Sequence, residues 1–230
     1  MAKKKDNRAI VARNTIIGFI TVIAILVFGF GAYVSTPLSS PSEISASDDI
    51  TEVENPRPRR VGEPITVVEF FSYNCIHCMN FDPLIEEWAA EQADDVVFSR
   101  QPAMWSPIQV LLGQAYLTLV DKDVLEENHT RIFRAIHDRR KQFLTADMVG
   151  DYVDGRGISK ADFVRAFNSP RVKTATRTAE SEQRRYQISS TPSLVVAGRY
   201  VVGMDGGAGR AIQIVDKLVE QIRAEDQSKG

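Results

Sequence analysis

The sequence predicts an α/β protein in which two segments of mixed strands and helices flank a block of helices. Ile65 to Tyr73 is a β-branched and aromatic run, the region from Ile108 to about Arg185 shows helical spacing without a convincing strand, and strand signals return at Ser193. With 43% hydrophobic residues the chain can bury a core, whereas two cysteines cannot staple a fold of 230 residues. The net charge of −2 gives no reason to expect a nucleic-acid partner.

The N-terminal region reads as a membrane anchor with a tether. Residues 1–14 form a basic tail, and residues 15–34 are nearly all apolar, long enough to span a bilayer core of ~30 Å as a helix. We interpret 15–34 as a retained transmembrane signal anchor, with a cleaved signal peptide as the alternative. Basic residues that flank a membrane-spanning helix stay on the cytoplasmic side. The rest of the chain is therefore expected in the periplasm of a bacterium, attached to the inner membrane. Residues 35–60, rich in Ser, Pro and acid, predict a flexible periplasmic linker, with packing of an irregular segment on the domain as an equal alternative near residues 55–60.

A strand, a helix and a second strand are expected next, within residues 61–106. The first strand, 65–73, contains Glu69, a carboxylate that is costly inside a sheet unless it is paired or functional. The helix, 76–90, contains Pro83, and the second strand covers 95–104. A right-handed parallel crossover is the default connection. The apolar face of the helix is expected to consist of Phe81, Leu84, Ile85 and Trp88.

Residues 107–185 are expected to form an inserted block of about four helices. Ser169 is predicted as an N-cap and Pro170 as the first helical residue after it. We expect His129 and His137 to lie on the helix surface, and Trp88 and Trp105 to lie in the core. Within 186–230 we expect strands at 193–197 and 199–202 joined at Gly198, then a helix whose buried stripe is Ala211, Ile214, Val215, Leu218 and Ile222.

The strongest chemical signal is Cys75-Ile76-His77-Cys78, directly after a strand and at the start of a helix. A helix N-terminus offers unpaired N–H groups and a positive dipole end, so Cys75 should favour its thiolate. His77 can add positive charge near this sulfur and lower its pKa further. Cys78, one turn inside the helix, can close a disulfide with Cys75 and is expected to be shielded. The pair is predicted to be an attacking and a resolving thiol.

Two other interpretations of the cysteines compete with this one. Half of a zinc site would need two more ligands, and the remaining histidines, His129 and His137, lie in the helical block. A purely structural disulfide is awkward across two residues and has no need of His77. We therefore expect a redox-active dithiol, with no metal and no cofactor.

Thr191-Pro192 is a second, weaker signal. A proline at the mouth of a central strand has no ladder donor, so it belongs at the first residue or in a special turn. A cis bond would explain it, although only ~5% of such bonds are cis. Its place just before the returning strand raises the odds of a cis bond.

These residues together resemble the DsbA family of bacterial disulfide oxidoreductases. The resemblance rests on the run from Glu69 to Cys78, on the two αβ halves around a helical block, and on Pro192 before the strand SLVVAGRYVV. It covers roughly residues 61–225 and implies a thioredoxin fold with an inserted all-helical domain, its halves being 61–106 and 186–230 around 107–185.

The resemblance also implies roles for single residues. Cys75 would form the mixed disulfide with substrate and Cys78 would resolve it, with Glu69 transferring a proton near Cys78. Pro192 would be cis and face the dithiol, lining the substrate groove together with Ile76 and Thr191. Asp82 falls where the family has another acid, but it reads equally well as a solvated helix charge.

The expected function is a periplasmic thiol:disulfide oxidoreductase that donates its Cys75–Cys78 disulfide to reduced secreted proteins. By resemblance, a membrane redox partner of the DsbB type would reoxidise it. Two departures leave room for an isomerase or reductase kept reduced by a membrane electron donor: Ile76 stands where the family has Pro, and Thr191 where its oxidases have Val. A tethered binding protein with an apolar groove is a third, non-enzymatic alternative.

Overall fold

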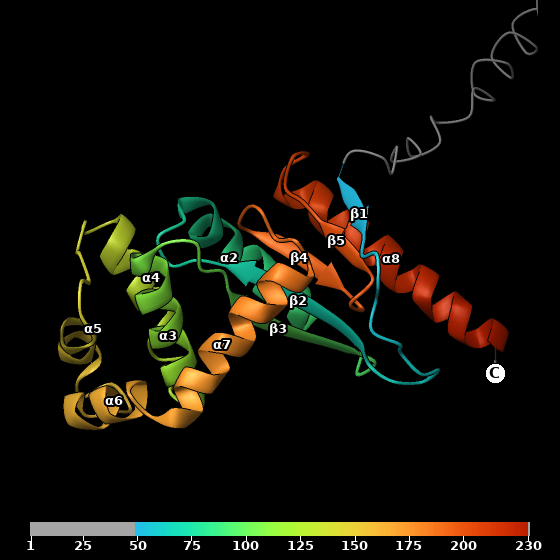
Figure 1. The fold of residues 1–230 in the computed structure, drawn as a ribbon. Coiled ribbons are helices and arrows are strands. Elements are labelled where there is room, and N and C mark those ends of the chain that lie inside the picture. Colours follow the sequence, from blue (N-terminus) through green and yellow to red (C-terminus); the bar gives the residue numbers. More distant parts are fainter. Residues whose placement is uncertain (1–48, 230) are drawn as a thin grey trace, which may run out of the picture. The chain divides into compact units, whose positions relative to one another are not determined.

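The computed structural model describes residues 49–229 (Figure 1). The predicted tail at 1–14, the transmembrane segment at 15–34 and most of the linker lie outside the described residues. Among the helices within 49–229, none combines the length and the apolar character that a membrane crossing needs.

A five-stranded mixed sheet forms the centre of the described chain. Its strands are β1 (Ile50–Glu52), β2 (Ile65–Phe71), β3 (Val96–Pro102), β4 (Ser193–Val196) and β5 (Tyr200–Val202). They lie in the order β1-β5-β4-β2-β3, with β2 and β3 parallel and the other neighbouring pairs antiparallel. The predicted parallel crossover is confirmed. The β4–β5 turn has positive φ at both Ala197 and Gly198, the backbone that a tight hairpin requires.

Strand β1 corrects the prediction for the linker. Residues 35–60 were expected to be a flexible tether, yet residues 50–52 form an edge strand paired with β5. Further along, the Arg59 guanidinium donates to both carboxylate oxygens of Asp226, at 3.0 and 2.8 Å. The last part of the predicted linker is therefore attached to the domain, which confirms the alternative for residues 55–60. Three residues without apolar periodicity gave no strand signal in the sequence.

Helices α2 (Ile76–Ala90) and α8 (Ala208–Lys229) contact each other, and α8 packs on β4 and β5. The bounds of α2 are those predicted, with Pro83 inside the helix, and Trp88 is buried as expected. The prediction for Leu84 was wrong, because its side chain is 43% exposed. The predicted stripe of α8 is buried throughout: Ala211, Ile214, Val215, Leu218 and Ile222.

The helical block contains five helices where about four were expected. They are α3 (Pro107–Asp121), α4 (His129–His137), α5 (Ala146–Val153), α6 (Lys160–Phe167) and α7 (Pro170–Arg185). Ser169 caps α7 and Pro170 begins it, as predicted. In Figure 1 the block lies beside the β2 and β3 side of the sheet.

An aromatic core joins the helical block to the end of β2. Phe71 and Tyr73 pack edge-on against Phe133 of α4 and Tyr116 of α3. Cys78 is buried in the same cluster, so the block closes over the inner side of the dithiol. Trp105, in contrast, was expected in the core but is 46% exposed.

Candidate active site

The dithiol sits where β2 passes into α2. Cys75 is the N-cap of α2, and its Sγ accepts a hydrogen bond from the backbone N–H of Cys78 at 3.4 Å. Cys75 is half-buried whereas Cys78 is fully buried, and both are free thiols in this structure. The predicted contrast between an accessible and a shielded cysteine is thus present in the geometry.

The two thiols have opposite proton affinities. The pKa of Cys75 is lowered from 9.0 to about 5, chiefly by a hydrogen bond from the Cys78 thiol, with help from Thr191 and from the backbone N–H groups of Cys78 and His77. Burial raises the pKa of Cys78 far above its ordinary value, and the nearby Cys75 raises it further. Near neutral pH, Cys75 is the thiolate of the pair and Cys78 keeps its proton.

His77 is exposed beside the dithiol. Its contribution to the lowered pKa of Cys75 comes through its backbone N–H. An acidifying effect of its imidazole therefore stays a prediction.

The Thr191-Pro192 peptide bond is cis, as the resemblance implied. This loop faces the dithiol, since the Cys75 Sγ lies 3.3 Å from the carbonyl oxygen of Thr191. Pro192 is buried directly before β4, so the sheet fixes the position of the loop. The thiol and the loop that could align a substrate strand are thus adjacent.

A groove of about 420 Å³ opens beside this pair. Apolar surface from α2, the cis-proline loop and the start of α8 lines much of it, which explains why Leu84 is exposed. Ile76, 44% exposed, lies next to Cys75 but does not line the groove. The lining residues are His77, Asn80, Phe81, Leu84, Ser190, Thr191, Pro192, Met204, Asp205, Gly207 and Ala208.

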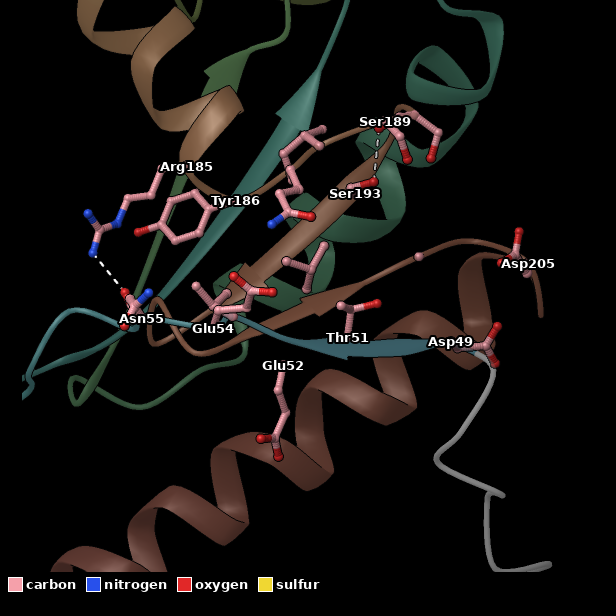
Figure 2. A pocket seen from close by; sticks show the side chains of 16 residues that line it. Asp49, Thr51, Glu52, Glu54, Asn55, Arg185, Tyr186, Ser189, Ser193 and Asp205 are labelled. Atoms are coloured by element: carbon pink, nitrogen blue, oxygen red, sulfur yellow. Dashed lines mark hydrogen bonds between the residues drawn. The ribbon is translucent and has the colours of Figure 1, made fainter.

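A second cavity of about 570 Å³ meets the groove at Ser190 and Asp205. Figure 2 shows residues of β1 on one side of it and residues of the loop before β4 on another. Acidic side chains dominate its charge, and Arg185 donates to the carbonyl of Asn55 at its edge, at 3.0 Å. Sequence reasoning missed this cavity because its β1 wall lies in the predicted linker.

Glu69 is buried on the inner side of the dithiol, on the interior strand β2. Burial raises its pKa from 4.5 to about 7, although the nearby Arg100 guanidinium opposes the shift. Arg100 Nε donates to Glu69 Oε2 at 3.1 Å, across the parallel β2–β3 pair. Sequence reasoning missed Arg100, although an arginine inside a predicted strand next to one with a buried acid was an available signal.

Asp82 belongs to the same buried cluster. It is 5% exposed and its Oδ1 accepts from Arg100 Nη2 at 2.8 Å, so the interpretation as a solvated charge is wrong. Arg100 also donates to the exposed Glu86 at 3.1 Å. One guanidinium thus serves three carboxylates, two of which are buried.

The prediction that the histidines of α4 lie on the surface was wrong for His129, whereas His137 is half-buried. His129 is 4% exposed, with Nδ1 2.8 Å from the Tyr73 hydroxyl and Nε2 3.1 Å from Asp82 Oδ1. His137 Nε2 donates to the Tyr73 carbonyl at 2.9 Å. Both histidines bind the turn that leads to Cys75, a long-range contact that helical periodicity cannot reveal.

The class of protein follows from these features together. A dithiol at a helix start, one thiol acidified and the other buried, facing a cis-proline loop on a sheet with an inserted helical block, defines a thioredoxin-fold thiol:disulfide oxidoreductase.

Comparisons with known proteins give the family. Residues 109–209 match a family model described as a DSBA-like thioredoxin domain. The thiol:disulfide interchange protein DsbA of Azotobacter vinelandii is 36% identical over 187 residues, covering 80% of this chain and 87% of the relative. DsbA of Pseudomonas aeruginosa is 32% identical over 92% of this chain and 98% of the relative.

Solved structures agree. The crystal structure of P. aeruginosa DsbA matches with a TM-score of 0.74 at 32% identity, covering 78% of this chain and 94% of that one. The oxidoreductase DsbA from Xylella fastidiosa matches with a TM-score of 0.72 at 33% identity, covering 76% and 96%. The chain belongs to the DsbA family of thiol:disulfide oxidoreductases. These relatives do not favour the isomerase or reductase alternative.

Proposed function

We propose that this chain oxidises reduced secreted proteins in the periplasm by donating the Cys75–Cys78 disulfide. The single observation that carries this proposal is the acidified Cys75 thiol beside a buried Cys78. A thiolate that is stabilised in the reduced enzyme makes reduction of the enzyme favourable. The enzyme is then a strong oxidant of other thiols.

The reaction runs in two exchanges. A client thiolate attacks the Cys75 sulfur of the oxidised enzyme, the Cys75–Cys78 bond breaks, and Cys78 leaves and takes up a proton. A second client thiolate attacks the client sulfur of the mixed disulfide, and Cys75 leaves as a thiolate. The client loses two electrons and gains a disulfide, and the enzyme becomes the dithiol.

Glu69 is proposed to exchange the proton with Cys78. Its raised pKa, about 7, lets it give the proton to Cys78 during donation and accept it during reoxidation. Its electrostatic effect on Cys78 supports this role, since Glu69 contributes to the raised pKa of that thiol. We also propose a catalytic role for His77, because its exposed imidazole lies beside Cys75.

Clients are proposed to bind in the groove between α2 and the cis-proline loop. The carbonyl of Thr191, 3.3 Å from Cys75 Sγ, is placed to pair with an extended client chain, and Pro192 fixes that loop. Ile76 adds exposed apolar surface beside the reactive sulfur.

The proposed location rests on the sequence. Residues 15–34 would anchor the chain in the inner membrane, with 1–14 in the cytoplasm, the start of 35–60 as the tether and the catalytic domain in the periplasm. A DsbB-type membrane protein would reoxidise the dithiol. Protease treatment of spheroplasts tests the topology, because only a periplasmic domain would be digested.

The redox equilibrium of the full chain with glutathione tests the function. Among thioredoxin-fold dithiols, a DsbA protein marks the oxidising end of the range of reduction potentials, at about −120 mV. We expect a potential of about −120 to −150 mV for the Cys75–Cys78 couple. A value of about −200 mV or below would overturn disulfide donation as the main role, because the reduced form would then have no special stability.

A further inference from the structure

The cavity between β1 and the loop before β4 has no part in the chemistry described above. It has a volume of about 570 Å³ and shares Ser190 and Asp205 with the proposed client groove. Ser190 directly precedes Thr191, whose carbonyl oxygen lies 3.3 Å from the Cys75 Sγ. Each residue advances an extended chain by about 3.3 Å, so residues that flank a client cysteine at Cys75 can reach the cavity.

The charge of the cavity wall is unbalanced. Among the described residues that line it, Arg185 is the one base, and its guanidinium donates to the backbone carbonyl of Asn55 at 3.0 Å. Four acids line the same wall: Asp49, Glu52, Glu54 and Asp205. The cavity therefore presents an excess of negative charge to a client, next to the groove in which the client cysteine reacts.

Asp49 gives a second, independent reason to expect a cationic ligand. It is 7% exposed, and Figure 2 shows it near Asp205 at one end of the cavity. Its Oδ2 accepts a hydrogen bond from the Arg210 guanidinium, whereas Oδ1 has no hydrogen-bond partner within residues 49–229. A buried carboxylate oxygen without a donor is costly, so a charged N–H group that pairs with it at this end of the cavity removes that cost.

The wall fits a basic side chain better than a metal ion. In the part of the chain that the structure describes, no three side chains of His, Cys, Asp or Glu are close enough together to hold a metal. The acids are instead spread along the cavity, with Glu54 and Asp205 toward opposite ends in Figure 2. Lysine and arginine have an apolar stem below the charged group, and Val53 and Ile188 offer apolar surface in the same wall.

We propose that this cavity is a client subsite that binds a lysine or arginine close to the reactive cysteine of the client. The inference rests on the proposed function, because it takes the groove beside Cys75 as the client site. The cavity meets that groove at one place, Ser190 and Asp205, so an extended client reaches it from one side of the cysteine. The preferred clients are therefore secreted chains with a basic residue within about four positions on that side.

The size of the preference follows from the kind of contact. The acids of the wall are partly shielded from solvent, so the gain lies between that of an exposed ion pair and that of a buried charged hydrogen bond. We expect lysine to be favoured over glutamine by about three- to tenfold at the matching client position. Added salt should reduce this factor, because mobile ions screen the exposed acids.

The preference can be measured as a competition on the full-length C78S variant. Cys75 attacks a peptide disulfide, one peptide thiolate leaves, and the mixed disulfide remains because no second thiol is present to resolve it. Two reduced peptides with one cysteine each are then supplied in equal amounts, identical except for lysine or glutamine at one position. The thiolate of either peptide attacks the Cys75 sulfur and displaces the bound peptide, and mass spectrometry gives the ratio of the two mixed disulfides at equilibrium.

The substituted position is moved from about four residues before the peptide cysteine to about four residues after it. A lysine preference is expected on one side of the cysteine and not on the other. Glutamic acid at the same position should be disfavoured relative to glutamine, because it meets the acids of the wall.

Neutral substitutions assign the preference to the cavity. D49N, E54Q and D205N, each combined with C78S, remove one charge from the wall with little change in side-chain size, and E126Q does the same to an exposed acid outside the cavity. The lysine preference should be unchanged in E126Q and should fall to about half or less in the other three. The side chains of Glu54 and Asp205 are exposed, so E54Q and D205N decide the test if D49N does not fold.

Two results would overturn the proposal. One is the absence of a lysine preference at every position, and the other is a preference as large in E54Q and D205N as in E126Q. Failure of the proposed function has a different signature, because the competition requires no disulfide donation. A lysine preference together with a reduction potential of about −200 mV or below would retain the subsite and reject donation as the main role.

Discussion

Helix α2 and four of the five helices of the inserted block each begin with a side-chain cap, but the capping atom of α2 differs in its chemistry from the others. In four helices of the block, the N-cap hydroxyl accepts the backbone N–H three residues on: Ser106 in α3, Thr145 in α5, Ser159 in α6 and Ser169 in α7. In α2 the capping atom is the Cys75 Sγ, which accepts the N–H of Cys78 at 3.4 Å.

The difference lies in what the capping atom can become. A hydroxyl oxygen accepts without ionising, so its cap contributes only to helix stability. A sulfur accepts weakly as a thiol and strongly as a thiolate, so the same backbone donors favour loss of its proton. A feature that stabilises α7 therefore becomes, at α2, a source of redox chemistry. The Cys78 thiol and Thr191 add donors that no cap in the block has.

The largest expected effect comes from turning the sulfur cap into a hydroxyl cap. C75S retains an acceptor for the Cys78 N–H, so the circular dichroism of the protein should not change. Oxidation of a reduced model peptide should fall to the uncatalysed background, because no mixed disulfide can form.

C78S is the matched control for this substitution. It should keep the reactive Cys75. When it is offered a peptide that contains a disulfide, Cys75 attacks that disulfide, one peptide thiolate leaves, and the mixed disulfide should accumulate and be detected by mass spectrometry. Measurable peptide oxidation by C75S would contradict the assignment of Cys75 as the attacked sulfur.

The buried carboxyl on the strand before this cap leads to the second prediction. Glu69 is 1% exposed, and its pKa is raised from 4.5 to about 7 in the folded chain. The folded state therefore binds more protons than the unfolded state between these values, and Glu69 costs stability as the pH rises through that window. E69Q removes this cost and leaves Arg100 paired with Asp82.

Urea unfolding at several pH values measures this effect. The free energy of unfolding of E69Q should gain about 3 kcal/mol relative to wild type between pH 4.5 and pH 7. Below pH 4.5 the difference between the two proteins should no longer depend on pH. Parallel stability curves across the whole window would contradict the raised pKa.

Features of the fold and of the site that depend on local sequence could be predicted. The strand before Cys75, the helix after it and the cap at Ser169 each follow from a few neighbouring residues. The cis bond before Pro192 came from the family resemblance, because proline chemistry alone favours the trans form.

What escaped prediction depends on contacts far apart in the sequence. His129 bonds Asp82 across 47 positions, so its helical periodicity could not show that it turns inward. Arg100 was visible inside a predicted strand, but its partner Glu69 appears only when β2 and β3 are paired in register. The edge strand at 50–52 forms by pairing with β5, which lies about 150 positions further along the sequence.

A smaller effect is expected at the proposed client groove, where the side chain of Leu84 is exposed. L84A removes apolar surface from the groove while keeping a good helix former. The KM for an apolar client peptide should rise by about three- to tenfold, with little change in kcat. Leu144 is 62% exposed and does not line the groove, so L144A is the control and should leave both constants unchanged. Equal effects of the two substitutions would contradict the groove as the client site.

The smallest effect isolates the share of the helix start in the acidity of Cys75. S169C places a thiol on an ordinary cap of α7, where the backbone N–H of Val172 is the donor and no second cysteine follows. The pKa of the new thiol should fall below its ordinary value by less than about one unit, the size of the effect of a helix terminus alone at this half-buried site. Alkylation rates against pH, measured in a C75S/C78S background, give this value. If the new thiol were as acidic as Cys75, whose pKa is about 5, the helix start alone would account for the shift, and Cys78 and Thr191 would not be needed.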